Sequence, residues 1–227
     1  MRVNRLLIVA IVLIALSAAT AYALPTGAKV SAGAQERGTA NIAPGNAPAA
    51  GGNITPVNLT SKSITEAWHG FYGQMQGNIT LEDNAGFRMY AWAFNTSGGE
   101  VFASRNNSIN WAIIGPRNDC TTDEALTGTG SDRTNLTFAQ SANTAFTVGG
   151  TNIGANSACT THTYVNNASQ VVDFEEVILN STTSIVYTGL LELDATGFDG
   201  GAYDFQLIVP DNRTSAVETY YFYAELS

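Results

Sequence analysis

Residues 68–94 read WHGFYGQMQGNITLEDNAGFRMYAWAF, and this stretch decides the fold class. Its first half alternates with period two, which is typical of a β-strand with one buried face. Residues 83–86 then supply turn residues, and residues 87–94 are apolar on both faces. The stretch therefore predicts a β-hairpin, with glycines on the core face where a large side chain packs against the backbone. The predicted core face holds Phe71, Gly73, Met75, Gly77, Ile79 and Leu81.

The chain keeps this character to its C-terminus. Short runs of β-branched and aromatic residues are separated by Gly, Asn and Asp, with turn signals about every 8–12 residues. The pattern predicts an all-β fold, a single antiparallel β-sandwich of roughly nine or ten strands. Further strands are expected at residues 100–104, 108–114, 135–138, 145–148, 161–165, 171–179, 183–193, 203–209 and 218–226.

The first residues have the three parts of a secretory signal peptide. Arg2 and Arg5 precede an apolar run, and small residues lead to an A-x-A cleavage pattern at residues 21–23. The alternative is an uncleaved anchor, because residues 6–24 approach the roughly 20 residues that a membrane span needs. The small-residue exit favours cleavage after Ala23, and either outcome exports the rest of the chain.

The segment after the signal peptide is rich in Ala, Gly and Pro and contains no aromatic residue. Such a composition cannot bury enough apolar surface to offset the entropy of ordering. The sequence therefore predicts a signal peptide over residues 1–23, a flexible linker over residues 24–56, and the β-sandwich domain over residues 57–227.

Acidic residues outnumber basic ones, 19 against 10, which gives a formal net charge of −9. Removal of Arg2 and Arg5 with the signal peptide leaves 8 basic residues and a net charge of −11. Phosphate binding needs clustered Lys and Arg, so this balance excludes nucleic acid and anionic lipid as partners. The membrane is expected to be contacted only through an uncleaved N-terminal segment.

The chain has two cysteines, Cys120 and Cys159. In an exported protein such a pair predicts a disulfide bond. The bond would close a loop of about 40 residues, for which the loop-entropy relation gives about 4 kcal/mol. A zinc site would need further ligands, and His162 is the histidine nearby.

N-x-S/T sequons occur nine times, where about 4 would be expected by chance from 20 Asn and 41 Ser or Thr. Asn53 is set aside because Pro56 follows its Thr55. Most of the others fall in expected turns or loops or on the polar face of a strand, where a glycan would be solvated. The expected glycosylation sites are Asn58, Asn78, Asn95, Asn106, Asn135, Asn167, Asn180 and Asn212.

The stretch ELDATGFDGGAYD at residues 192–204 is rich in the oxygen ligands that calcium prefers. Its spacing does not match the EF-hand loop, and capping of turns by Asp is the favoured interpretation. No other cofactor is expected. A second acidic group, Asp173, Glu175 and Glu176, is expected to be a solvated strand face. The candidate calcium ligands are Glu192, Asp194, Asp199 and Asp204.

Motifs of the common enzyme classes do not occur: there is no G-x-S-x-G, H-E-x-x-H, P-loop or G-x-G-x-x-G. A glycosidase needs two carboxylates about 5–9.5 Å apart, and 19 acids make coincidental pairs easy. His69 and His162 lie in no nucleophile motif. The sequence predicts a protein without catalytic activity, with a carboxylate-dependent hydrolase as the distant alternative.

The aromatic residues divide into two groups. Trp92 and Trp111 have apolar neighbours within expected strands, which favours core packing. Tyr72, Tyr90 and the run of aromatic residues at 220–223 are expected to form exposed surface, where glycans or another subunit could bind.

The motifs WHGFYG…GNITLED, YDFQLIVP and YYFYAEL, with INWAII between them, resemble a family of secreted archaeal β-rich surface proteins. The resemblance covers about residues 50–227 and rests on aromatic and glycine spacing, so it implies no site residue. No activity is established for the family. The resemblance implies an archaeal envelope setting, in which surface proteins are often N-glycosylated.

Together these features predict a secreted, N-glycosylated, non-catalytic archaeal cell-surface protein, a structural or assembly subunit that is S-layer-associated or filament-type. Its expected partners are copies of itself or other envelope proteins. A tail around residues 53–64, with strand-like alternation at residues 57–60, could add a strand to a neighbouring sheet. The alternative is a monomeric extracellular module for glycan binding or adhesion.

Overall fold

The computed structural model describes residues 24–40, 43–93, 98–139, 141–213 and 217–226. These residues form an all-β fold, as predicted, and every strand pairing among them is antiparallel. The predicted signal peptide at residues 1–23 and the sequon at Asn95 lie outside the described residues.

Fifteen strands occur in the described residues, and eight of them have five or more residues. The number of strands exceeds the predicted nine or ten because the loops contain short paired strands of two or three residues. The longer strands are β2 (Trp68–Gly73), β3 (Asn78–Glu82), β4 (Arg88–Ala93), β5 (Glu100–Ser104), β10 (Glu175–Ser181), β11 (Ser184–Leu190), β14 (Phe205–Pro210) and β15 (Tyr221–Glu225). The shorter elements are β1 (Thr26–Gly27), η1 (Trp111–Ile113), β6 (Gly115–Pro116), α2 (Glu124–Thr127), α3 (Thr134–Thr137), β7 (Phe146–Val148), β8 (Thr151–Ile153), β9 (Thr160–His162), β12 (Ala195–Thr196) and β13 (Ala202–Tyr203).

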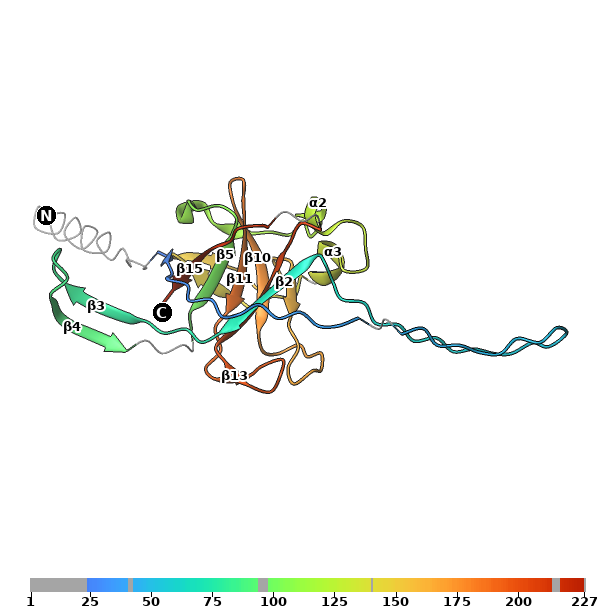
Figure 1. Cartoon of the computed structure of the whole chain (residues 1–227). Coiled ribbons are helices and arrows are strands. Elements are labelled where there is room, and N and C mark those ends of the chain that lie inside the picture. The colour runs from blue at the N-terminus through green and yellow to red at the C-terminus, as the bar shows by residue number, and fades with distance from the viewer. Residues whose placement is uncertain (1–23, 41–42, 94–97, 140, 214–216, 227) are drawn as a thin grey trace, which may run out of the picture.

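A seven-stranded sheet forms the centre of the protein, in the order β1-β15-β5-β11-β10, with β6 and β9 both paired to β10 (Figure 1). Consecutive residues of its strands enter opposite hydrophobic clusters, because successive side chains of a strand point to opposite faces. The first cluster holds Phe102, Trp111, Ile114, Val148, Ile153, Ala158, Val177, Leu179 and Val186. The second cluster holds Ala103, Phe138, Cys159, Ile178, Tyr187, Leu207 and Val209.

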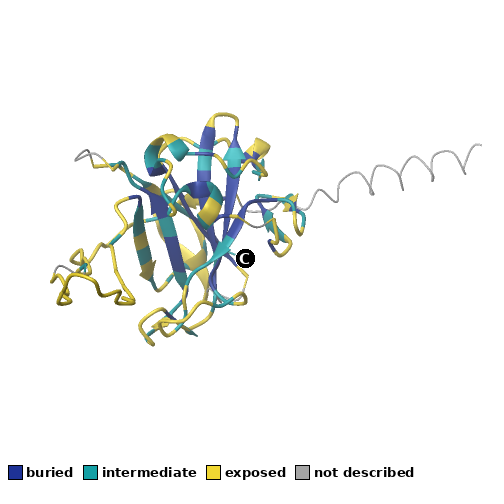
Figure 2. Cartoon of the chain, turned by 90° about the vertical axis from the view of Figure 1, so that its right-hand side faces the viewer, coloured by how far each residue is buried: buried dark blue, intermediate teal, exposed yellow. Residues whose placement is uncertain are grey.

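The central sheet is therefore covered on both faces. One face packs against η1 and the β7–β8 pair, which contribute to the first cluster. The other packs against a two-stranded sheet of β2 and β14. Figure 2 shows the buried residues concentrated in the central strands, with exposed loops around them. Burial on both faces explains why β5, β10 and β11 read as nearly continuous apolar runs.

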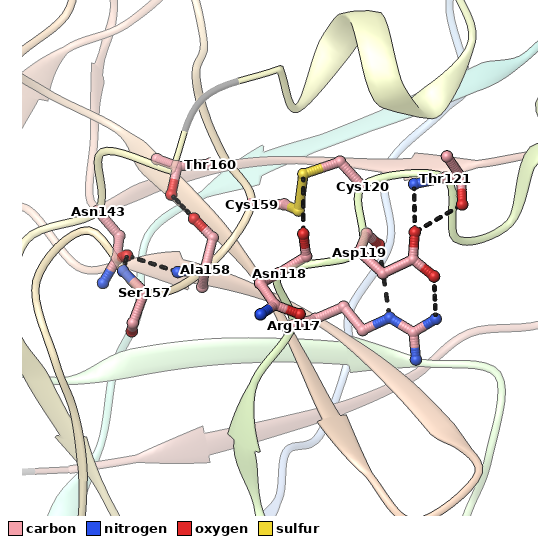
Figure 3. The surroundings of a disulfide bond; sticks show 10 residues. All are labelled: Arg117, Asn118, Asp119, Cys120, Thr121, Asn143, Ser157, Ala158, Cys159 and Thr160. Atoms are coloured by element: carbon pink, nitrogen blue, oxygen red, sulfur yellow. Dashed lines mark hydrogen bonds and ion pairs between the residues drawn. A yellow bond between two sulfur atoms is a disulfide. The ribbon is translucent and has the colours of Figure 1, made fainter.

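The predicted disulfide between Cys120 and Cys159 is present, and the Cα atoms of the two residues are 5.6 Å apart (Figure 3). Cys159 is fully buried. Its backbone N–H donates to the carbonyl of Arg117 at 2.7 Å, and its carbonyl accepts from the N–H of Ile178 at 2.9 Å. The bond thus ties the loop that carries α2 and α3 to strand β10.

The segment expected to be a linker contributes a strand at its start. Residues of β1 pair with β15, with Thr26 opposite Ala224, and Pro25 is buried. Edge pairing uses only the backbone, so a sequence of small residues can supply it. Residues 43–66, which include the end of the predicted linker and the start of the predicted domain, form an exposed arm that extends away from the body (Figure 1).

Two other local predictions differ from the structure. The expected strand at residues 108–114 contains the 3-10 turn η1, and the one at residues 135–138 overlaps the short helix α3. The long strand expected from residue 68 onward is divided into β2 and β3. The close approach predicted at its glycines occurs at Gly77, where a methyl group would lie 2.8 Å from Leu226 Cδ1, whereas one on Gly73 would make an ordinary contact of 3.7 Å with the Phe205 ring.

Candidate assembly surface

The small sheet of β2 and β14 has two edges that differ. At the β14 edge, Glu176 Oε2 accepts a hydrogen bond from the backbone N–H of Ile208 at 2.9 Å. At the opposite edge, no strand among the described residues pairs with the outer side of β2. An unpaired strand edge presents a row of N–H and C=O groups to which another strand can add.

Glu176 reaches this position from the central sheet. The side chain is fully buried, and burial raises its pKa well above the usual range, against the opposing effect of the bond from Ile208. Glu175 is also buried, and its carboxylate accepts from the backbone N–H and the hydroxyl of Thr144. The expectation of a solvated acidic face at Glu175 and Glu176 is therefore wrong, because β10 is covered on both sides.

The arm at residues 43–66 is a second distinctive feature. Its apolar side chains are exposed, with Ile54 at 99% and Leu59 at 90% of full exposure. At its base Arg37 and Glu66 form an ion pair at 3.4 Å. Residues 57–60, whose alternation predicted a strand, pair with no strand in the described part of the chain.

The β3–β4 hairpin pairs only with itself among the described residues, and it projects from the body on the side away from the arm (Figure 1). One face is apolar, since Ile79 lies opposite Trp92 and Leu81 lies opposite Tyr90. These four side chains are 47–59% exposed. Core packing of Ile79, Leu81 and Trp92 is thus not found, because no second layer among the described residues covers the hairpin.

The opposite face of the hairpin carries small and polar residues. Asn78 pairs with Ala93, and Thr80 pairs with Ala91. Asn78 is exposed, as the alternation predicted. The hairpin is therefore amphipathic, with the sequon on the face away from the apolar side chains.

A cluster of three aromatic rings lies on the outer side of the small sheet. The Tyr72 ring is 4.9 Å from the Phe198 ring and 4.7 Å from the Tyr203 ring, measured between centroids. Tyr72 is 52% and Phe198 is 41% exposed. The exposure of Tyr72 and Tyr90 agrees with prediction, whereas Phe198 and Tyr203 were not singled out by sequence.

The aromatic run at residues 220–223 is mostly structural. Tyr220 donates its hydroxyl hydrogen bond to the carbonyl of Pro210 at 2.7 Å, and burial raises its pKa. Phe222 packs edge-on against Phe71, with centroids 5.0 Å apart. Tyr221 is the member of the run that is exposed. The run therefore does not form the continuous aromatic surface that was expected.

The described sequons fall into two groups. Those in the first group are exposed: Asn58, Asn78, Asn106 and Asn167. Those in the second group are half-buried: Asn135, Asn180 and Asn212. Asn180 lies within β10 and not in the loop that was expected.

Two sequon amides already have partners. Asn106 Nδ2, the atom that would carry a glycan, donates to Ser184 Oγ at 2.7 Å. Asn135 Oδ1 accepts from Arg133 Nε at 2.5 Å. Attachment at Asn106 would replace its bond to Ser184.

The candidate calcium ligands do not converge on one point. Asp204 is buried and accepts from the backbone N–H groups of Met75 and Asp194. Asp199 accepts from the N–H of Gly201 and from the Tyr203 hydroxyl. Burial and the nearby Asp173 raise the pKa of Glu192. No group of three or more His, Cys, Asp or Glu side chains in the described residues is arranged to hold a metal ion.

One close carboxylate pair escaped the sequence analysis. Glu100 on β5 lies directly opposite Glu225 on β15, and both are buried. Glu100 lies two residues before Phe102, and Glu225 lies two residues after Tyr223, so each acid shares a strand face with an aromatic residue of the first cluster. This spacing was the sequence signal that could have indicated burial of the acids. One surface depression is lined by Arg105, Asn106 and residues 183–185, and another lies around His162 and Gln170; neither of these is lined by a carboxylate.

Comparison of the chain with protein-family models, with curated proteins and with solved structures returned no match. None of the helices in the described residues has the length and apolar character needed to cross a bilayer.

Proposed function

We propose that this protein is an exported, N-glycosylated structural subunit of an archaeal cell envelope that assembles with copies of itself. In this proposal, the arm of one copy adds a strand to the outer edge of β2 in the next copy. The protein works through this assembly and not through a reaction.

The observation that carries the proposal is that one chain has both a strand edge without a partner and an exposed apolar segment. The outer side of β2 has no strand partner in the described residues. Phe71 on β2 belongs to the second hydrophobic cluster, so an added strand would extend a layer that already covers the central sheet. An extended segment adds to such an edge through backbone hydrogen bonds, and its alternate side chains fit the apolar layer.

The side chains of the arm suit this role. Val57 and Leu59 would point to one face of an added strand, and Asn58 would point to the other. With Val57 and Leu59 facing the central sheet, a glycan on Asn58 would face solvent. The sequon and the apolar residues thus support the same orientation.

Export and an archaeal setting are supported by sequence. The signal-peptide pattern and the disulfide agree with an oxidising compartment. The motif resemblance to secreted archaeal surface proteins and the excess of sequons agree with a glycosylated envelope protein.

Deletion of residues 43–62 tests strand addition, because it removes the arm and leaves β1 and β2 in place. We expect the deleted protein to remain folded and monomeric, whereas the full-length exported protein forms assemblies visible by electron microscopy. A synthetic peptide of residues 53–64 should bind the deleted protein at one to one and block assembly of the intact protein.

Two point variants sharpen the test. Leu59→Asp should abolish assembly, because it would bury a charge against the apolar layer. Asn58→Gln removes the sequon from the neighbouring position and should leave assembly intact. Undiminished assembly of the deleted protein would overturn strand addition, and so would a monomeric full-length protein whose arm pairs with its own β2.

The aromatic cluster of Tyr72, Phe198 and Tyr203 favours a second candidate function, extracellular glycan binding. Exposed aromatic rings beside polar groups can stack on the apolar faces of sugar rings. Tyr72→Ala should abolish binding on a glycan array, and Tyr164→Ala serves as the control at another exposed tyrosine. An array without signal for the unaltered protein would reject this function.

A further inference from the structure

The buried acids Glu100 and Glu225 form an unusual arrangement at one end of the central sheet. They are cross-strand partners in β5 and β15, and they are 4% and 7% exposed. Partners in an antiparallel pair share a face, so the two carboxyl groups lie side by side. Like charges directly opposite each other are destabilising, and burial removes the water that would screen them.

The hydrogen bonds of this pair are incomplete. Both oxygens of Glu225 accept from the backbone N–H of Gly149, at 3.0 and 2.9 Å. Glu100 Oε2 is buried and has no hydrogen-bond partner in the described residues, and the same is true of Thr188 Oγ1. Burial and the neighbouring Glu225 raise the pKa of Glu100 to about 8, and burial raises the pKa of Glu225. Glu100 Oε2 therefore lacks a hydrogen-bond donor among the described residues, and a positively charged donor near the pair would favour its ionised form.

The arginine and lysine side chains of the described residues do not meet this need. All six arginines in the described part of the chain form ion pairs elsewhere, with Glu66, Glu82, Asp123, Asp119, Glu124 and Asp132. The two described lysines, Lys29 and Lys62, are exposed. His162 lies opposite Glu175 at the far side of the sheet.

Leu24, which is 51% exposed, lies beside Gly149, the residue that binds the Glu225 carboxylate. The register of β1, with Thr26 opposite Ala224, places Pro25 opposite Glu225 when continued by one residue. A methyl group on Gly149 would lie 2.7 Å from Leu24 Cδ2 and 3.9 Å from Leu24 Cα. Gly149, whose N–H holds the Glu225 carboxylate, thus contacts Leu24 as well.

We propose that removal of residues 1–23 creates a free α-ammonium group at Leu24 that forms an ion pair with the carboxyl pair, through Glu225, the acid of the neighbouring strand. This inference rests on the export step of the proposed function. A peptidase hydrolyses the Ala23–Leu24 bond: the hydroxyl of water goes to the Ala23 carbonyl carbon, and a hydrogen goes to the Leu24 nitrogen. The amine then takes a proton from solvent. Processing thereby completes the site and fastens β1 to β15.

Competitive acetylation of the exported protein as isolated from cells, read by mass spectrometry, tests the proposal. The intact mass should correspond to a chain that begins at Leu24. An α-amine has an ordinary pKa of about 7.7–8.0, and a rise of one unit makes its acetylation at pH 7 about tenfold slower than in the unfolded chain. Burial without an ion pair would lower that pKa, so a raised value is specific for pairing.

Glu225→Gln should return the pKa of the Leu24 amine toward its ordinary value, and Glu36→Gln on an exposed segment is the control. If Glu225→Gln fails to fold, the pKa of the Leu24 amine in the unaltered protein is sufficient to test the proposal. An unraised pKa, or a mass that shows another first residue, would overturn the proposal. Because acetylation reports on the Leu24 amine of each chain whether or not the chains assemble, a failure of assembly leaves this result readable.

Discussion

Glu176 Oε2 accepts the backbone N–H of Ile208 at 2.9 Å, so a fully buried side chain of the central sheet occupies the place where a third strand would pair with β14. This contact leaves β2 as the edge at which the small sheet can grow. It also places a carboxyl group where ionisation is unfavourable.

Glu176→Gln should make stability less dependent on pH. The folded protein holds the Glu176 proton more tightly than the unfolded chain, so stability is greatest below the unfolded pKa of about 4.5 and falls as pH rises toward the folded pKa. The fall is up to about 1.4 kcal/mol for each pH unit in that window. Urea denaturation between pH 4 and 8 should show a flatter profile for the variant.

Glu176→Gln keeps an oxygen that can accept the Ile208 N–H. Glu176→Ala removes it and should cost about 2–4 kcal/mol at pH 5, because a buried N–H loses its partner and a cavity opens. Equal pH slopes for the unaltered protein and Glu176→Gln would contradict the assigned burial.

Trp111→Ala and Trp92→Ala form a matched pair. Trp111 is 9% exposed and packs in the first cluster against Phe102, so its loss should cost about 3–5 kcal/mol of unfolding free energy. Trp92 is 48% exposed on the projecting hairpin, and its loss should change stability by less than about 0.5 kcal/mol. Thermal denaturation followed by circular dichroism measures both. Equal losses would show that the hairpin is packed.

Replacement of both cysteines by alanine should lower the unfolding free energy by about 4 kcal/mol, from the entropy of a loop with a sequence separation of 39. Because Cys159 is buried, alanine avoids placing an unpaired hydroxyl group in the core. Guanidinium denaturation of the unaltered protein with and without reductant provides the comparison. An unchanged midpoint would show that the bond is absent in the exported protein.

Glycan occupancy should follow exposure. Glycopeptide mass spectrometry should find Asn58, Asn78 and Asn167 more fully occupied than Asn135 and Asn180, because the latter two are half-buried and Asn135 is hydrogen-bonded through its amide. Occupied Asn180 with vacant Asn78 would argue against the register of the β3–β4 hairpin.

Sequence patterns predicted most of the longer strands correctly, and they predicted the two faces of β2. Period-two alternation placed Phe71 toward the core and Tyr72 outward, because that alternation follows directly from strand geometry. It could not distinguish the covered strand β2 from the uncovered strand β3. The pattern therefore predicted Ile79 and Trp92 as core residues, although no second layer of described residues covers them.

Glu175 and Glu176 show the opposite error, because they were predicted to be exposed and are buried. Two adjacent acids resemble a solvated strand face, and only tertiary packing shows that β10 is covered on both faces. The edge role of residues 26–27 was equally hidden, since backbone pairing leaves no side-chain pattern. Trp111 was correctly expected in the core, but η1 and not a strand places it there.

The reversal of the arm at residues 50–53, where Asn53 N–H donates to the carbonyl of Ala50 and Gly52 has a φ of 84°, offers a site for engineering. Both flanking stretches are exposed, so a peptide epitope inserted between Gly51 and Gly52 would meet no packed side chain of the body. Such an insertion leaves residues 53–64 intact and would allow the protein to carry a label while its folded body stays unaltered.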